Sequence, residues 1–174
     1  MKKLFITLLF GVFLYGEVLI NIDQAMQTEY GKNIEIKKKS IILTKDEAIK
    51  IQKIAKTKIN SKIFKVYIAK NDSNIIGFSV LMSKKIRSKN GVILYMLDTK
   101  GTLKGIEIIA FNEPLEYLPS EDWKKQFNEL AKNTNPKVGQ NIHTITGATL
   151  SAKTITSGAR IAQALYIIKL KELN

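Results

Sequence analysis

The stretch of this chain best suited to chemistry is a run of small residues, Thr146 to Thr149, just before a long segment with helical periodicity. Small side chains let another molecule approach the backbone closely, and Gly147 can adopt backbone angles that other residues avoid. A helix start also presents unpaired N–H groups and a positive dipole end, which together attract phosphate. The hydroxyls of Thr149 and Ser151 can each bond an anion. These residues predict an anion-binding helix start, although a plain helix cap would use the same residue types.

Several other kinds of chemistry are excluded by composition. The chain has no cysteine and one histidine, His143. Disulfides, thiolate metal sites, iron–sulfur clusters and multi-histidine metal sites are therefore excluded. The sequence has neither the glycine-rich loops that hold nucleotide phosphates nor the G-x-S-x-G turn of serine hydrolases. We predict no metal site and no residue that acts as a catalyst on its own.

Two β-hairpins are the first elements expected to position this stretch. Alternating or continuous apolar residues predict strands over 63–69 and 75–82, with a polar turn between them. A second pair of strands is predicted over 91–97 and 103–111, joined by a turn in which Gly101 supplies a positive φ.

Helices are predicted before and after the two hairpins along the chain. Thr44 and Glu47 have the spacing of a capping box, which predicts a helix that starts there. Ser120 is expected to cap a helix over 121–131, and a long last helix is expected over about 150–173. These elements indicate an α+β fold, with an antiparallel sheet of two hairpins, helices packed on it and a long C-terminal helix.

The N-terminal residues predict export from the cytoplasm. Two lysines precede an apolar run over 4–16, which has the length of a signal-peptide core and is too short to span a bilayer comfortably. We expect three regions along the chain: a signal peptide or uncleaved anchor over 1–16, an N-terminal helical and extended segment over 17–60, and the main domain over 61–174.

The chain is strongly basic, with 28 Lys and Arg residues against 15 Asp and Glu and a formal net charge of +13. Such a charge suits an acidic protein partner or anionic lipid headgroups. The lysines are scattered, which is equally typical of a lysine-rich composition with no role in binding. We expect no nucleic-acid partner for an exported protein.

The segment TGATLS, at residues 146–151, resembles the flavinylation motif of the FMN-binding domain family. That family includes the C component of the sodium-translocating NADH:quinone reductase and the G component of the Rnf complex. The segments DTKGTLKGIEIIAFNEP, EDWKKQF and SAKTITSGARIAQAL are also similar to the family, in the same order, so the resemblance covers about residues 63–165. It implies covalent FMN, joined through its phosphate to Thr149 by an FAD:protein FMN transferase.

The resemblance implies two groups of cofactor-binding residues. The group around the phosphate comprises Thr146, Gly147, Ala148, Thr149 and Ser151. The group in a loop that would contact the flavin ring comprises Glu113, Leu115 and Tyr117. The sequence departs from the family pattern at His143, where members usually have an aspartate, and after Glu113, where the family has E-T-P-G-L-G.

The resemblance further implies an exported flavoprotein that transfers electrons between redox proteins of the membrane or periplasm. Its location would be the periplasm or the extracytoplasmic face of the cytoplasmic membrane. In such a protein the cofactor performs the chemistry, while the chain attaches, orients and tunes it. Two alternatives stay open: a flavin-dependent reductase that acts directly on a small acceptor, and a cofactor-free binding module of an envelope complex.

Overall fold

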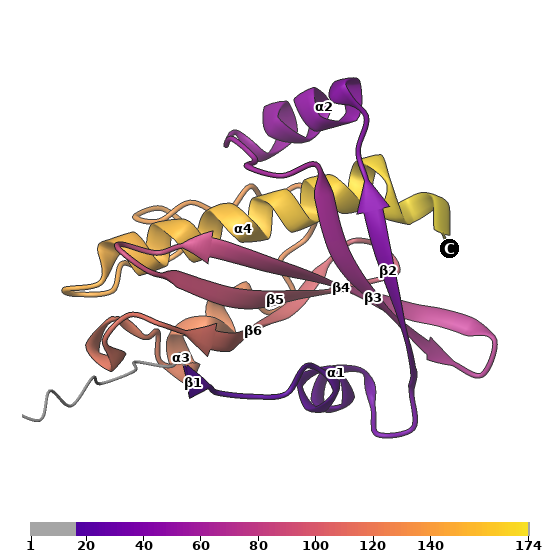
Figure 1. The fold of residues 1–174 in the computed structure, drawn as a ribbon, viewed down its shortest axis with the longest axis horizontal. Helices are drawn as coiled ribbons and strands as arrows, with labels where there is room; N and C mark the ends of the chain where they lie inside the picture. Colours follow the sequence, from indigo (N-terminus) through magenta and orange to yellow (C-terminus); the bar gives the residue numbers. More distant parts are fainter. Residues whose placement is uncertain (1–16, 174) are drawn as a thin grey trace, which may run out of the picture.

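A six-stranded antiparallel sheet forms the middle of the molecule (Figure 1), in the order β1-β6-β5-β4-β3-β2. The computed structural model describes residues 17–173, so the predicted signal peptide or anchor over 1–16 lies outside the described residues. The strands are β1 Glu17–Val18, β2 Glu35–Ile42, β3 Ile63–Asn71, β4 Asn74–Lys85, β5 Asn90–Asp98 and β6 Leu103–Phe111. The α-helices are α1 Ile22–Tyr30, α2 Lys45–Ala55, α3 Glu121–Lys124 and α4 Thr149–Ile168. This arrangement confirms the predicted α+β fold.

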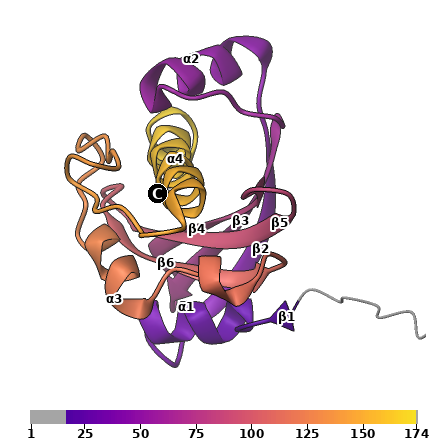
Figure 2. The same cartoon turned by 90° about the vertical axis from the view of Figure 1, so that its left-hand side faces the viewer.

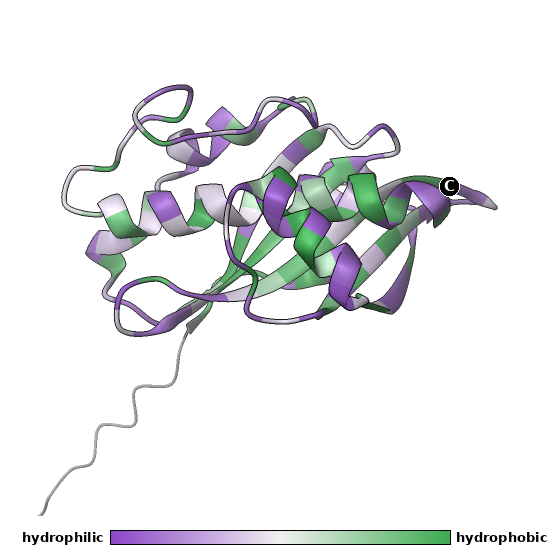
Figure 3. Cartoon of the chain, turned by 90° about the horizontal axis from the view of Figure 1, so that it is seen from above, coloured by the Kyte–Doolittle hydropathy of each residue, from purple (hydrophilic) through white to green (hydrophobic). Residues whose placement is uncertain are grey.

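The helices cover both faces of the sheet. Figure 2 shows α4 on one face, with α2 stacked on the outer side of α4, and α1 on the opposite face. The larger core lies between the sheet and α4, and its fully buried members include Phe78, Tyr95, Leu97 and Ile155. A smaller core lies under α1, around Met26. Hydrophobic residues follow the strands below α4, whereas the loops are mostly hydrophilic (Figure 3).

The two predicted hairpins are confirmed as β3–β4 and β5–β6. In β3 the alternating residues Phe64, Val66 and Ile68 are buried in the larger core, as period-two patterning requires. The turn between β5 and β6 has Gly101 at φ 84°, and the Asp98 carboxylate accepts hydrogen bonds from two backbone N–H groups of the turn. Local sequence therefore determines both hairpins.

The segment before β3 adds strands to both edges of the sheet. β2 pairs with β3 along its whole length, from Glu35 opposite Lys70 to Ile42 opposite Ile63. β1 pairs with the end of β6 at Phe111. No helix within residues 17–173 has the length and hydropathy needed to cross a bilayer.

The predicted helix starts agree with the structure, whereas the predicted end of the helix that begins at Glu121 does not. Thr44 and Glu47 form the predicted capping box of α2. The helix predicted over 121–131 is wrong in length, because α3 ends at Lys124 and a 3-10 turn follows over Lys125–Phe127. The next residues leave the helix because Leu130 pairs with Leu103 through two backbone hydrogen bonds of 2.8 and 3.1 Å.

The last helix is continuous from Thr149 to Ile168, and a 3-10 turn over Leu170–Leu173 follows it. Its apolar side packs in the larger core. Ile155, Ala159, Ala162 and Leu165 are all fully buried. The helix axis therefore crosses the sheet in a fixed position, which sets where its N-terminus lies.

Candidate functional site

Three segments meet at the end of the molecule where α4 begins. They are the 3-10 turn η1 (Leu115–Tyr117), the turn between β4 and β5, and the start of α4. The Arg87 guanidinium lies 4.0 Å from the centre of the Tyr117 ring, which joins the first two segments. The Thr154 hydroxyl lies 3.5 Å from the Lys85 carbonyl oxygen, which joins the turn to α4. These contacts link the loop that contains Leu115 and Tyr117, through the β4–β5 turn, to the first two turns of α4.

The start of α4 offers free hydrogen-bond donors. Ala148 occupies the cap position, and its side chain makes no capping bond. The N–H groups of Thr149, Leu150 and Ser151 are the first of the helix and have no partner within residues 17–173. Three unpaired N–H groups at the positive end of a 20-residue helix form an anion-binding arrangement. The plain-cap alternative does not account for a start that has no side-chain cap.

The residues around these donors leave room for another molecule. Gly147 has φ 76°, which favours glycine, and a Cβ atom added there would meet no atom within 4 Å. Thr146 and Thr149 are exposed. Ser151 is fully buried, and its hydroxyl oxygen has no hydrogen-bond partner in the described part of the chain. Thr149 therefore presents the accessible hydroxyl beside the free N–H groups.

Glu113 is used by the turn between β4 and β5. One carboxylate oxygen accepts hydrogen bonds from the backbone N–H groups of Arg87, Ser88 and Lys89, at 3.0, 2.6 and 2.7 Å. These bonds, led by that of Lys89, lower the pKa of Glu113, and burial opposes them. Glu113 thus holds this turn beside the loop that follows β6. Its contact with a flavin ring stays a prediction.

Apolar side chains are exposed on both sides of the site. Leu115 is 61% exposed, and Leu150, which follows the candidate attachment residue, is 50% exposed. Tyr117 is half-buried beneath the Arg87 guanidinium. Large apolar side chains at a polar helix start suit a ligand that has both a phosphate and an aromatic ring. The sequence prediction included Leu115 and Tyr117 but not Leu150, although Leu150 lies within TGATLS. It also missed Arg87, which no motif marks.

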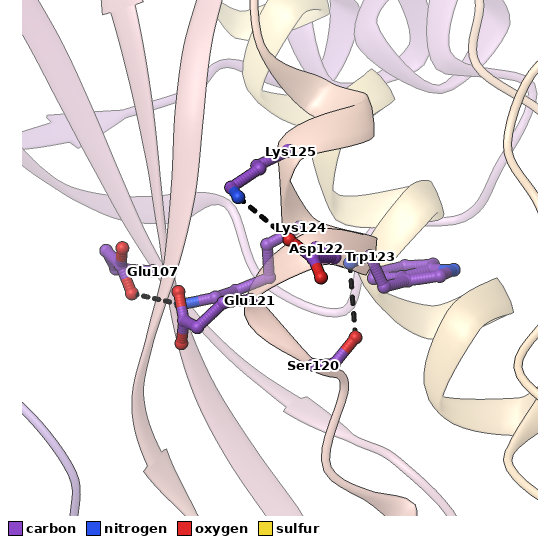
Figure 4. A network of polar contacts seen from close by, with 7 residues as sticks. All are labelled: Glu107, Ser120, Glu121, Asp122, Trp123, Lys124 and Lys125. Carbon is purple, nitrogen blue, oxygen red and sulfur yellow. Dashed lines mark hydrogen bonds and ion pairs between the residues drawn. The ribbon is translucent and has the colours of Figure 1, made fainter.

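A polar network fixes the short helix α3 against β6 (Figure 4). The ammonium group of Lys124 is buried and lies 2.5 Å from the Glu107 carboxylate and 2.9 Å from that of Glu121. Burial lowers the pKa of Lys124, but the two carboxylates outweigh it and raise the pKa overall. The Ser120 hydroxyl caps the helix by accepting from the Trp123 N–H at 3.2 Å. The network therefore sets the position of Trp123.

Trp123 in turn holds the loop that leads to the site. Its indole N–H donates to the carbonyl oxygen of His143 at 2.9 Å, and the His143 N–H donates to the side-chain oxygen of Gln126 at 2.7 Å. Trp123 is buried and packs on Phe127. The exposed His143 side chain is six residues before Thr149, and its backbone is held by α3 and by the 3-10 turn over Lys125–Phe127.

Glu113→Gln is expected to loosen the turn between β4 and β5. The amide keeps one acceptor oxygen but loses the charge, so the bonds from Arg87, Ser88 and Lys89 weaken. Hydrogen exchange at these three amides should become about tenfold faster. Because the folded-state pKa of Glu113 is depressed, its stabilising effect is present above the unfolded pKa and is lost as pH falls through the folded pKa. The exposed Glu116, changed to Gln, is the matched control; equal exchange in both variants would contradict this role.

A comparison with known protein families matches the part of the chain that contains the candidate site. Residues 87–164 match the family model of the FMN-binding domain. These residues contain the β4–β5 turn from Arg87 onward, the loop after β6 and the start of α4. The chain therefore resembles the FMN-binding domain family, which confirms the resemblance drawn from the sequence.

A particular relative is the G component of the Na+-translocating ferredoxin:NAD+ oxidoreductase complex of Acetobacterium woodii. The two are 28% identical over 116 residues, which cover 60% of this chain and 56% of the relative. The match thus spans little more than half the length of that relative.

Proposed function

We propose that this protein carries FMN in phosphoester linkage to Thr149 and transfers electrons between redox proteins outside the cytoplasm. The observation that carries the proposal is the exposed Thr149 hydroxyl at a helix start whose first three N–H groups are unpaired. A phosphate joined to this oxygen would accept hydrogen bonds from those N–H groups. The segment TGATLS supplies this residue within the matched FMN-binding domain.

The attachment step needs FAD and a separate FAD:protein FMN transferase. The Thr149 oxygen forms a bond to the FMN phosphorus, the bond to the AMP phosphate breaks, and the hydroxyl proton is released. Gly147 and Ala148 leave the backbone approachable there. Ser151, whose buried hydroxyl has no partner in the described part of the chain, is proposed to donate a hydrogen bond to the phosphate.

The flavin ring would lie against exposed apolar residues near Thr149. Leu150 and Leu115 offer apolar surface, while Tyr117 and the Arg87 guanidinium form a stacked pair beside it. FMN supplies the ability to accept and donate one or two electrons, whereas the chain binds it and sets its surroundings. Exposure of these residues favours an electron carrier, because the edge of the ring would be open to a protein partner.

The relative's name and the charge of the chain support a proposal for the partners and the location of this protein. A component of a Na+-translocating oxidoreductase complex has membrane redox partners, and we propose such partners for this protein. Together with the predicted N-terminal signal, such partners support a location on the periplasmic face of the membrane. A formal charge of +13 would steer acidic partners to it.

The test is to export the protein in a host that also exports the transferase. We expect a yellow protein that keeps its flavin through denaturation. Its intact mass should exceed that of the bare chain by one FMN less one water, and the modified peptide should contain Thr149. An unmodified Thr149 peptide from such a host would contradict covalent attachment.

A further inference from the structure

A pocket of about 600 Å³ lies at the place where β3 and β4 separate. The ladder between these strands ends at Lys65 opposite Leu81, whereas β4 continues along β5 as far as Lys85 opposite Asn90. Figure 1 shows β3 turning toward α2 while β4 runs on beside α4. The pocket is bounded by these two strands, the loop after α2 and one side of α4.

The pocket adjoins the proposed FMN site at the contact between Thr154 and Lys85, but it lies on another side of α4 than Thr149. Its lining includes no residue of the group around Thr149 and none of the loop after β6. On α4 it is lined by Thr154, Ser157 and Ile161, which share one side of the helix because they are three and four residues apart. At about 100° per residue, Thr149 lies about 140° around the helix axis from Thr154. A ligand in the pocket would therefore be a second ligand.

The lining combines apolar side chains with positive charge. Ile59, Phe64 and Met82 contribute apolar surface. Four lysines also line the pocket, and no acidic residue does: Lys58, Lys65, Lys84 and Lys85. Within residues 17–173, none of these lysines forms an ion pair. Three of them are exposed, whereas Lys84 is half-buried.

Lys84 is the lysine of this pocket whose surroundings oppose its positive charge. Burial lowers its pKa, and the positive charge of Arg160 adds to this effect. Arg160 donates to the carbonyl oxygens of Ala55 and Pro136, at 2.7 and 2.8 Å. Among residues 17–173, no carboxylate forms an ion pair with Lys84 or Arg160. A half-buried ammonium without a counter-ion is costly, and an anion brought next to it would recover that cost.

We propose that this pocket binds a free organic carboxylate with an apolar body. The carboxylate would pair with Lys84, and the apolar part would cover Phe64 and Met82. The volume lies in the range of small-molecule sites. The ligand carries one charge because a single lysine is half-buried inside, while the other three lie exposed at the rim.

The probe for this proposal is decanoate, compared with decyltrimethylammonium, which has the same chain and the opposite charge. Each is titrated into the ¹⁵N-labelled protein, both with FMN and as Thr149→Val. Decanoate should shift the amide signals of Ser83, Lys84 and Ser157 saturably in both forms, and the cation should not. Because both forms are tested, the result does not depend on whether FMN is attached.

Matched variants test the role of Lys84. Lys84→Met keeps the apolar stem and removes the charge, so it should weaken decanoate binding about tenfold. Lys38→Met removes an exposed, unpaired lysine of β2 and should leave binding unchanged. Ser157→Trp should fill the pocket and abolish binding. Equal binding of the two probes, or unchanged binding in a folded Lys84→Met protein, would overturn the proposal.

Discussion

Replacement of Thr149 by valine is expected to give a colourless protein that keeps the parent fold. Valine has nearly the shape of threonine but no hydroxyl oxygen to form the phosphoester. Thr149 is exposed and does not cap α4, so its hydroxyl contributes little to the helix. The free energy of unfolding should change by less than about 0.5 kcal/mol. Covalent flavin should fall to background in the denatured protein, measured by absorbance and intact mass.

Thr144→Val is the control for this experiment. Thr144 is an exposed threonine of the same loop, and it has no hydrogen-bond partner among residues 17–173. It should be modified to the same extent as the parent. If Thr149→Val keeps covalent FMN, the phosphoester lies on another residue and the assignment fails. If both variants lose FMN, the transferase requires the whole loop, and Thr149 loses its special role.

Gly158→Ala is expected to destabilise the fold, although alanine normally stabilises a helix relative to glycine by about 0.5–1 kcal/mol. A Cβ atom at Gly158 would lie 2.0 Å from the Tyr95 hydroxyl oxygen and 2.4 Å from the adjacent ring carbon. Tyr95 is fully buried, and its hydroxyl donates to the Ile155 carbonyl at 3.0 Å. The ring cannot move without breaking that bond and disturbing the core.

The expected loss combines overpacking with a broken buried hydrogen bond, about 3 kcal/mol in total. For a chain of this size the melting temperature should fall by roughly 6–12 °C. Thermal and urea unfolding followed by circular dichroism would measure both quantities. Ser157→Ala, one position earlier on the pocket side of α4, should change stability by less than about 0.5 kcal/mol. A Gly158→Ala protein as stable as the parent would show that the contact between α4 and β5 is loose.

Much of the fold follows from local sequence. Alternation in β3, the turn at Gly101 and the capping box at Thr44 involve neighbours within a few residues, so they can be predicted without a structure. The start of α4 at Thr149 was predictable for the same reason, since small residues precede a long helical pattern. The chemical part of the site therefore follows from TGATLS at residues 146–151.

The surroundings of that site depend on contacts between residues far apart in the chain. The contact of Glu113 with the flavin ring stays a prediction, but the sequence did not indicate that its carboxylate accepts hydrogen bonds from N–H groups 24 to 26 residues earlier. The helix at Ser120 is short because Leu130 pairs with Leu103, a competition that local helix propensity does not contain.

By itself, the sequence determined the hairpins and the helix starts, and it indicated the hydroxyl that we propose for attachment. Only the tertiary structure decided which segments surround that hydroxyl and where β3 and β4 separate to form the second pocket. The physical reason is the range of the interactions. Hydrophobic periodicity, turns and caps depend on residues that are near neighbours in the sequence. The separation of β3 from β4, the surroundings of Lys84 and the position of Arg87 over Tyr117 arise only when distant segments pack together.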